Sequence, residues 1–490
     1  MIAVSVRLFA TLRQYHPQAA AGAISVQLDE GATVGDLVQR LGIPRQAVRV
    51  TFVNGLVVDD TARLQEGDDV GIFPPIAGGG EVLFFQIRTP CEAKEHFFST
   101  WLPPPPRVET VSLEAAWGRV LAADVVVPRD LPEFFRSTVD GYAVRAADTF
   151  GAGEGLPAYL SVVGEVGMGE APRVRVGPGE AAWIPTGGML PEGADAVVMV
   201  EHTEKLDRRT VEVKRAVGPG ENLIRPGEDF PAGAVALRRG RRLAPQDLGL
   251  LAGIGATEVP VAVPPAVALI STGDEIVPPQ IEPRPGQIRD INTYTLSALV
   301  RQEGGTPRFF GLIPDVYDAL LAALRRAAES SDLILISGGS SVGPRDLVAR
   351  AIDAIGSPGV LVHGVSMKPG KPTILGAAGG KAVVGLPGHP TTVMIVFYVF
   401  AREMIWRLLG LEASPPVPLR ARLARRVASA PGREDYLRVF LERRNGELWA
   451  VPLLGKSGLI ATMVKADGLV RVPLEREGVE VGEPVEVWTW

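Results

Sequence analysis

Four short stretches in the second half of the chain carry residues that could bind an anion or a metal ion. Asp274 and Glu275 lie just after the apolar run "ALIST", and residues 337–340 read "SGGS" directly after "DLILI". Lys368 and Lys371 lie between prolines in "SMKPGKP", and the rigid turn "PGHP" follows "KAVVGL". Small residues after a strand allow backbone N–H groups to converge on an anion, and the lysines add positive charge. These residue types suit a ligand with several negative oxygens.

Each stretch has a simpler interpretation when it is taken alone. A Gly-Gly pair after a strand is commonly a plain turn, and two lysines flanked by prolines commonly form a solvated loop. Together the four stretches predict an anion-binding edge with carboxylates beside it. Those carboxylates would repel a phosphate-like anion unless a cation such as Mg²⁺ lay between them. The predicted Mg²⁺ ligands are drawn from Asp274, Glu275, Asp290 and Asp346.

Bringing these residues together requires a particular kind of sheet. The runs "AVALIS", "TPRFFGLI", "DLILIS" and "KAVVGL" are short, apolar and β-branched, and helical patterns separate them. The apolar faces of the two clearest helical patterns consist of Leu296, Leu299 and Val300, and of Leu320, Ala323, Leu324 and Ala327. Buried strands that alternate with helices predict a doubly wound, mainly parallel sheet. In such a sheet, ligands bind at the carboxyl ends of the strands, where these loops lie.

The rest of the chain predicts further units. Residues 1–77 predict two strands, a helix and two more strands, with a hairpin turn at Asn54-Gly55. Residues 108–262 are rich in Val, Gly and Pro and predict a β-rich region of one or two lobes. Strands and turns from residue 414 onwards predict a small β-barrel. The stretch "WLPPPP" (101–106) predicts an extended, passive linker.

The composition bounds the class of protein. The chain has 490 residues, 46% of them hydrophobic and 22% charged, which is typical of a soluble protein of about three domains. Its net charge of −6 gives no sign of general affinity for nucleic acid or for an anionic membrane. A single cysteine, Cys91, excludes an intramolecular disulfide, and the N-terminus lacks a signal-peptide pattern. The most apolar segment, 393–401, is too short to cross a bilayer, so we expect a buried helix there and a cytoplasmic protein.

The β-rich region adds isolated polar residues. Asp140 precedes a glycine in "STVDGYAV", which by itself is a turn signal. Thr186 lies in a glycine-rich bend, and Asp229 follows another acid in "RPGEDF". The stretch "LLGKSG" (453–458) looks like part of a phosphate-binding loop, but that motif requires a strand–loop–helix setting and a glycine at position 450, where this chain has Ala450. We therefore do not assign a phosphate site to it.

Eight motifs occur in the order and approximate spacing of a known family. They are "STVDGYAV", "PTGGMLPEGADAVV", "RPGED", "STGDE", "IRDIN", "SGGSSVG", "MKPGKP" and "GLPGHP". Over residues 85–490 the chain resembles the molybdopterin molybdenumtransferases, a family similar to the C-terminal part of gephyrin. Residues 1–79, which end in "FPPIAGG", separately resemble the small sulfur-carrying subunit of molybdopterin synthase, a ubiquitin-like protein.

The resemblance implies an activity and a set of site residues. The family inserts molybdate into adenylylated molybdopterin and releases AMP, so the implied ligands are molybdate, adenylylated molybdopterin and Mg²⁺. Catalytic or other functional roles are implied for Asp140, Thr186, Asp229, Glu275, Asp315, Asp346 and Lys368. The residue patterns and the resemblance together give the residues expected to bind the nucleotide, the pterin or molybdate, which are Ser337, Gly338, Gly339, Ser340, Lys368, Lys371, Pro387, His389 and Pro390. Family members form elongated homodimers whose active site draws on the partner's β-rich region, so Asp140 and Thr186 are expected to act across that interface.

The expected architecture follows from the patterns and the resemblance together. It combines a ubiquitin-like β-grasp domain, a β-rich middle region, a doubly wound α/β domain and a small C-terminal β-barrel. The expected boundaries are 1–79, 80–107 for a linker and first helix, 108–262, 263–411 and 412–490.

The chain departs from the family pattern at four places. Position 389 is His where Asn is usual, and Val139 stands where Met is usual. Gly364 lies where some relatives have Lys, and Thr391-Thr392 replaces a common Val-Ser. The change at position 389 bears most on the site, because it exchanges an amide for a titratable ring.

Two other functions are considered. A molybdopterin adenylyltransferase shares the 265–410 type of domain, but it lacks the β-rich motifs found here at 136–144 and 184–198. A catalytically silent scaffold that docks enzymes of the cofactor pathway would not need the acidic motifs.

The glycines at 78–80 raise a separate question. In the carrier family the terminal glycine carboxylate is adenylated and converted to a thiocarboxylate, whereas here Gly79 is bonded to Gly80. The chain is therefore either cleaved after Gly79, which leaves Gly78 and Gly79 as the carrier tail, or the domain acts only as a docking module. Cleavage is favoured, because "FPPIAGG" retains the complete carrier ending. The implied partners are the large subunit of molybdopterin synthase and the carrier-activating enzyme.

Overall fold

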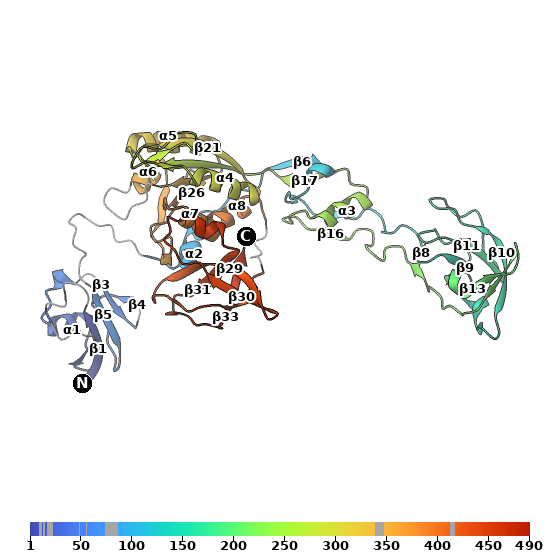
Figure 1. Ribbon diagram of the computed structural model, residues 1–490, viewed down its shortest axis with the longest axis horizontal. Coiled ribbons are helices and arrows are strands. Elements are labelled where there is room, and N and C mark those ends of the chain that lie inside the picture. Colours follow the sequence, from blue (N-terminus) through green and yellow to red (C-terminus); the bar gives the residue numbers. More distant parts are fainter. Residues whose placement is uncertain are drawn as a thin grey trace.

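The computed structural model describes residues 1–8, 12, 15–16, 23–48, 50–54, 56–73, 87–338, 347–411 and 417–490. Figure 1 shows a small N-terminal sheet, a central α/β domain with a barrel beside it, and a long arm with two lobes. The described ranges leave out Gly55 of the predicted hairpin turn, the glycines at 78–80, and the candidate site residues Gly339, Ser340 and Asp346.

The N-terminal sheet contains five strands and carries one α-helix within its described residues. Its elements are β1 (Ile2–Leu8), β2 (Ile24–Leu28), α1 (Val34–Arg40), β3 (Val50–Val53), β4 (Leu56–Val58) and β5 (Asp69–Phe73). The strand order is β2-β1-β5-β3-β4, with β1 and β5 parallel at the centre. The sequence pattern predicted four strands and missed β5. The buried residues of this sheet form a core of their own.

The central domain is built on a six-stranded sheet. Its strands are β18 (Ala266–Thr272), β21 (Thr306–Ile313), β22 (Leu333–Ser337), β23 (Pro358–His363), β25 (Ile374–Ala378) and β26 (Lys381–Leu386). The order is β21-β18-β22-β26-β25-β23, and the first four strands run parallel. Strand β25 is antiparallel to both neighbours, so the sheet is mainly parallel, as predicted.

Helices cover both faces of this sheet. On one face lie α4 (Asn292–Gln302), α7 (Pro390–Val396) and α8 (Arg402–Leu408), and on the other lie α5 (Tyr317–Ser330) and α6 (Leu347–Ile355). Alternate residues of β18 point to opposite faces, so Leu269 joins the first core and Ile270 the second. Both predicted helical faces are buried. The apolar segment 393–401 is largely buried and runs from α7 through a π-helical turn (Phe397–Ala401) into α8.

Helix α2 (Pro90–Thr100) anchors the segment that precedes the arm. Thr89 and Glu92 form a capping box at its start, and Pro90 occupies the first helical position. Trp101 is 2% exposed in the central core, and its Nε1 donates a hydrogen bond to the carbonyl of Gly380 at 3.0 Å. The proline-rich stretch predicted to be a passive linker therefore begins with an anchored residue.

The arm divides into two lobes. The inner lobe contains β6 (Val108–Ser112), β7 (Val125–Val126), β16 (Val235–Leu237), α3 (Pro245–Gly253) and β17 (Glu258–Ala262). The outer lobe is a six-stranded sheet of β9 (Gly141–Val144), β10 (Ala158–Glu165), β11 (Glu180–Ile184), β12 (Ala196–Met199), β13 (Thr203–Lys205) and β14 (Thr210–Val213). Strands β8 (Arg136–Ser137) and β15 (Leu223–Ile224) pair between the lobes (Figure 1).

The C-terminal strands close into a barrel. They are β27 (Leu419–Leu423), β29 (Glu434–Arg444), β30 (Glu447–Pro452), β31 (Gly468–Val472) and β33 (Pro484–Thr489), and the pairing of β29 with β31 completes the circle. Strand β24 (Met367–Lys368) pairs with β29 and joins the barrel to the central domain. The remaining short elements are β19 (Ile276–Val277), β20 (Ile288–Arg289), β28 (Val427–Ala428), α9 (Ala461–Val464) and β32 (Gly478–Val479). Within the described ranges, no helix has the length and apolar character needed to cross a membrane.

Candidate active site

Three strand ends of the central sheet meet at Gly338. Its N–H donates a hydrogen bond to the carbonyl of Leu386, at the end of β26, at 3.1 Å. Its φ is +97°, and a Cβ at this position would lie 2.2 Å from the carbonyl oxygen of Thr272, at the end of β18. Only glycine fits here, because any side chain would overlap the neighbouring backbone. The structure therefore brings the loops after β18, β22 and β26 together at one edge.

Asn292 ties two of these loops to the start of α4. Its Nδ2 donates hydrogen bonds to Ser337 Oγ at 2.7 Å and to the carbonyl of Gly388 at 2.8 Å. The residue is buried, and its Oδ1 has no hydrogen-bond partner among the described residues. Asn292 thus fixes the positions of Ser337 and Gly388. Sequence reasoning did not single it out, although it is the last residue of the "IRDIN" motif.

Three carboxylates gather beside this edge. Asp274 Oδ1 accepts a hydrogen bond from the backbone N–H of Asp315 at 3.1 Å. Partial burial raises the pKa of Asp315, and the nearby negative charges of Asp274 and Glu275 raise it further. A divalent cation would relieve this repulsion, because it prefers oxygen ligands and carries the opposite charge.

The arrangement fits a metal ion that is shared with a substrate. Asp290, another predicted ligand, is buried and caps α4, where its Oδ1 accepts a hydrogen bond from the N–H of Thr293 at 3.1 Å. In the part of the chain that the structure describes, no three His, Cys, Asp or Glu side chains surround a possible metal position. Mg²⁺ commonly takes one or two protein carboxylates and completes its shell with water and substrate phosphates. Asp274 and Glu275 could supply such a partial shell.

A pocket of about 600 Å³ lies between this edge and the C-terminal barrel. It is lined by segment 365–372, by Pro387 and His389 after β26, and by barrel residues that include Arg433 and Ser457. The lining holds two lysines and one arginine, and none of its described residues is Asp or Glu. The pocket adjoins the strand ends, because a Cβ on Gly388 would lie 3.4 Å from the Cα of Gly338. It is a positively charged cavity next to a carboxylate cluster.

One buried carboxylate behind the pocket positions two of its three cations. Asp435, on β29, has a 4% exposed side chain and forms ion pairs with Arg433 Nε at 3.0 Å and with Lys368 Nζ at 3.8 Å. Lys371 has no hydrogen-bond or ion-pair partner for its ammonium group within the described ranges, and its side chain is exposed. Lys371 is therefore the lining cation whose charge is least compensated.

His389 connects the two halves of the pocket wall. It precedes α7, in which Pro390 is the first residue, and its Nδ1 lies 3.0 Å from Ser457 Oγ of the barrel segment. The backbone N–H of Thr391 also donates a hydrogen bond to the carbonyl of Ser457, at 3.2 Å. His389 thus contacts the hydroxyl group of Ser457 and lines the same cavity as the three cationic side chains.

Two of the predicted catalytic residues contact each other in the outer lobe. The backbone N–H and the hydroxyl group of Thr186 donate hydrogen bonds to Asp140 Oδ1, at 2.7 and 2.9 Å. These two hydrogen bonds lower the pKa of Asp140. Their sheet lies at the far end of the arm from β26 and α4 (Figure 1). Asp229 lies in the inner lobe, where its N–H donates to the carbonyl of Leu131. Within one chain, these residues are not brought to the central sheet edge.

Sequence reasoning missed several residues of the pocket. Arg433 and Asp435 belong to the charged run "GRED", which appears in a region interpreted only as strands and turns. Ser457 belongs to "LLGKSG", a segment to which the sequence pattern assigned no phosphate site. That segment lies between β30 and the short helix α9, and it contributes Ser457 to the pocket lining beside His389.

Comparison with protein-family models divides the chain in the same order as the structure. The MoeA N-terminal region (domain I and II) matches residues 89–255, a probable molybdopterin binding domain matches 268–407, and the MoeA C-terminal region (domain IV) matches 420–490. The ThiS family matches residues 6–79.

Curated relatives and solved structures agree with these matches. The chain is 33% identical to molybdopterin molybdenumtransferase of Bacillus subtilis, with 77% of this chain and 89% of the relative covered. It is 36% identical to molybdopterin molybdenumtransferase 2 of Mycobacterium tuberculosis, with coverage of 77% and 94%. The crystal structure of the molybdopterin biosynthesis moeA protein of Pyrococcus horikoshii matches with a TM-score of 0.73 and 31% identity, covering 83% of this chain and 100% of that one. The chain therefore belongs to the molybdopterin molybdenumtransferase family and carries a ThiS-family domain at its N-terminal side.

Proposed function

We propose that the protein inserts molybdate into adenylylated molybdopterin and releases AMP. The observation that supports this most strongly is a pocket lined by Lys368, Lys371 and Arg433, with no carboxylate among its described lining residues. This pocket adjoins strand ends that carry Asp274 and Glu275. A reaction between an oxyanion and a nucleotide-linked substrate needs both a cationic cavity and a place for a divalent cation near phosphates.

Molybdate occupies the cationic pocket in this proposal. Lys371 contributes a point charge that is paired with no carboxylate of the described residues, while Asp435 holds Lys368 and Arg433 in place. Ser457 and His389 add hydrogen-bonding groups at the wall. The pterin dithiolene would be placed beside the oxyanion, so the contribution of the protein is chiefly positioning and charge neutralisation.

The nucleotide part of the substrate lies at the strand ends around Gly338. Mg²⁺ held by Asp274 and Glu275 would offset the charge of the pyrophosphate while water cleaves the phosphoanhydride and AMP leaves. Asp346 stays a candidate third ligand on the basis of its sequence motif. The reaction would take place in the cytoplasm.

A homodimer would complete the site. Asp140 and Thr186 form a hydrogen-bonded pair at the end of the arm, remote from the sheet edge of their own chain (Figure 1). In a homodimer the outer lobe of one chain could reach the pocket of the other. This arrangement gives the two residues a role that they cannot have within one chain.

Replacing Asp274 tests the proposal directly. Asn keeps the oxygen that accepts the hydrogen bond from Asp315, so Asp274→Asn should leave the fold intact while it removes one negative charge from the Mg²⁺ site. AMP release from adenylylated molybdopterin, with molybdate and Mg²⁺ present, should fall by about 100-fold or more. The control is Asp318→Asn, which removes an exposed carboxylate at the start of α5.

Three results would contradict the proposal. Unchanged AMP release by Asp274→Asn would remove the metal-site assignment. Synthesis of adenylylated molybdopterin from ATP by the parent protein would indicate an adenylyltransferase. No turnover of either substrate by the folded parent protein would favour a scaffold.

The N-terminal domain supports a second function. Its match to the ThiS family ends at Gly79, and Gly80 follows without a break in the chain. We propose that cleavage after Gly79 releases a sulfur carrier for molybdopterin synthase. Intact-mass measurement of protein from its native cell should find a fragment that ends at Gly79. Only the full-length 52.0 kDa chain would favour a docking role instead.

A further inference from the structure

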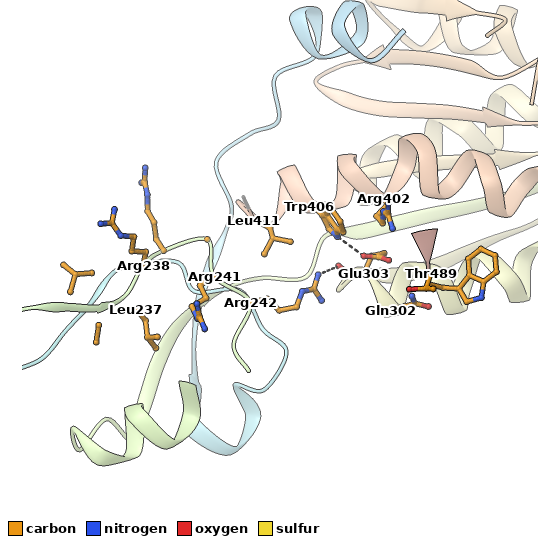
Figure 2. Close-up of a pocket in the computed structure, with 15 residues that line it drawn as sticks. Leu237, Arg238, Arg241, Arg242, Gln302, Glu303, Arg402, Trp406, Leu411 and Thr489 are labelled. Carbon is orange, nitrogen blue, oxygen red and sulfur yellow. Dashed lines mark hydrogen bonds between the residues drawn. The ribbon is translucent and has the colours of Figure 1, made fainter. Parts of the chain in front are cut away.

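A second pocket, of about 740 Å³, lies where the arm leaves the central domain. One wall is the segment 235–242, which includes the end of β16 and the following turn. The opposite wall combines the end of α4, helix α8 and the last two residues of the chain (Figure 2). This second pocket is separate from the one lined by the residues expected to bind pterin and molybdate. The two pockets have no described lining residue in common.

The lining of this second pocket is strongly cationic. It contains Arg238, Arg239, Arg241, Arg242 and Arg402, and its described lining includes one acidic side chain, that of Glu303. The chain as a whole carries a formal charge of −6, so this concentration of positive charge opposes the overall balance. A concave surface lined by one sign of charge focuses the electrostatic potential and raises the local concentration of counter-ions.

Three of the five arginines already have partners. Arg241 Nε lies 2.9 Å from Asp247 Oδ2, and Arg242 Nη2 donates a hydrogen bond to the backbone carbonyl of Glu303 at 2.9 Å. The guanidinium of Arg402 lies over the ring of Trp406, 5.0 Å from its centroid. These contacts hold the three side chains against the walls of the pocket.

The other two arginines are exposed and available. Arg238 and Arg239 have no side-chain hydrogen-bond or ion-pair partner in the described part of the chain. Glu303 does not compensate them, since its Oε2 accepts a hydrogen bond from Trp406 Nε1 at 2.8 Å and its side chain is buried. Figure 2 shows Arg238 on the side of the pocket opposite Glu303 and Trp406.

The turn that carries these arginines is fixed in the inner lobe. Gly240 has a φ of +80°, and its N–H donates a hydrogen bond to the carbonyl of Leu121 at 2.7 Å. The N–H of Leu121 in turn donates to the carbonyl of Arg241 at 2.9 Å. The backbone next to Arg238 and Arg239 is therefore held by two hydrogen bonds to Leu121, which lowers the entropy cost of presenting the turn to a ligand.

From this arrangement we infer that the junction pocket binds a small anion with two or more phosphate groups. Guanidinium groups match phosphate oxygens as two-pronged donors, and the adjacent pair at 238 and 239 can engage more than one phosphate. The volume suits a ligand of nucleotide size or smaller. Such a ligand would contact both the arm and the central domain, because residues of both line the pocket. A nucleoside triphosphate and inorganic pyrophosphate share the required chemistry.

Calorimetric titration of the full-length protein with pyrophosphate, and separately with ATP, tests this inference. The probes should bind the parent protein at about 0.15 M salt, and Arg238→Ala/Arg239→Ala should weaken that binding about tenfold or more. The matched control is Arg325→Ala/Arg326→Ala, which removes an exposed adjacent pair from α5 without touching the pocket. Equal affinities for the two probes would assign recognition to the phosphates alone, and tighter binding of ATP would add a contact to the nucleoside.

The titration also separates this site from the proposed active site. Binding at the junction should persist in Asp274→Asn and without Mg²⁺, because the pyrophosphate site proposed at the strand ends requires Mg²⁺ held by Asp274 and Glu275, and neither residue lines this pocket. The inference is overturned if the parent protein binds neither probe, if Arg238→Ala/Arg239→Ala binds both as well as the parent does, or if the control pair weakens binding equally. None of these results would bear on AMP release, so failure here is distinguishable from failure of the proposed function.

Discussion

At the residue scale, the cations of the candidate active site are not equivalent. Lys368 and Arg433 both form ion pairs with the buried carboxylate of Asp435, so part of their positive charge is neutralised within the protein. Lys371 shares the same loop and lining, but the described residues offer its ammonium group no such partner. An incoming dianion therefore gains most from Lys371.

Lys371→Ala should weaken molybdate binding by about 1.5–3 kcal/mol, the usual contribution of a charged hydrogen bond, or roughly 10- to 150-fold. Equilibrium titration with molybdate measures this change. The control is Lys465→Ala, which removes an exposed lysine after α9, away from the pocket. A change of less than about threefold for Lys371→Ala would argue against direct contact with the oxyanion.

His389 adds a titratable ring to the same cavity. When an imidazole gains a proton it becomes a cation, and it would join Lys368, Lys371 and Arg433 around the pocket. We expect the affinity for molybdate to be higher when the ring carries this added positive charge.

His389→Asn should remove any dependence of molybdate affinity on pH that comes from this ring, because an amide side chain does not gain a proton in this way. Asn also keeps a polar group near Ser457, so the local fold should survive. The measurement is the molybdate dissociation constant across a range of pH, with His96→Asn on α2 as the control. Identical profiles for the parent and His389→Asn would show that His389 does not influence the oxyanion.

At the scale of elements, the site depends on how closely the ends of parallel strands approach one another. Gly338 has room for no side chain, and Asn292 fixes the loops on either side of it. The same approach places the carboxylates after β18 and β21 beside the turn after β26. Packing of the sheet, rather than any one loop, therefore sets the geometry of the edge.

Gly338→Ala should lower the stability of the central domain. Gly286→Ala is the matched control, since Gly286 has a φ of +91° but an added Cβ would meet no atom within 4 Å. An alanine forced into the left-handed backbone conformation lowers the stability by about 1–2 kcal/mol at both positions. The overlap with Thr272 at Gly338 should add about 2 kcal/mol in urea unfolding. Equal losses of stability for the two variants would mean that the strand ends relax at little cost.

At the scale of the whole molecule, the chain separates its predicted catalytic residues. Asp140 and Thr186 lie at the tip of a long arm, while the pocket and the carboxylates lie in the central domain (Figure 1). The proposed homodimer removes this separation, because each pocket would receive the outer lobe of the other chain. In the proposed homodimer, Asp140 and Thr186 of one chain therefore act together with the pocket residues of the other chain.

Mixing two inactive variants tests this arrangement. If Asp140 serves the pocket of the other chain, a heterodimer of Asp140→Ala and Lys371→Ala contains one intact site. Random exchange of subunits should restore about a quarter of the parent activity in AMP release. A mixture of Lys371→Ala and Asp274→Asn is the control, because both changes lie in the central domain and leave no intact site. No recovery in the first mixture, with exchange shown by mass spectrometry, would place the whole site within one chain.

The sequence by itself determined the features that depend on local order along the chain. Alternation of apolar strands with helical patterns predicted the doubly wound sheet, and the burial of Leu296 and Leu324 confirms the predicted helical faces. The motifs after the strands were informative because the carboxyl ends of parallel strands must meet at one edge. Strands β5, β23 and β25 were missed. Strand β5 pairs with the distant β1, whereas β25 pairs with its neighbours β23 and β26 but has no alternation of buried and exposed residues that would reveal it.

Only the tertiary structure decided which of these residues meet. Arg433, Asp435 and Ser457 join the pocket because the barrel packs against the loop 365–372, through the pairing of β24 with β29. Nothing in the local pattern around "LLGKSG" indicates that its serine faces His389, which is 68 residues earlier in the chain. The junction pocket has the same origin, because its walls come from the arm, α4, α8 and the end of the chain. Contacts between segments so far apart follow from how the domains pack, and hydrophobic periodicity describes only which face of each segment is buried.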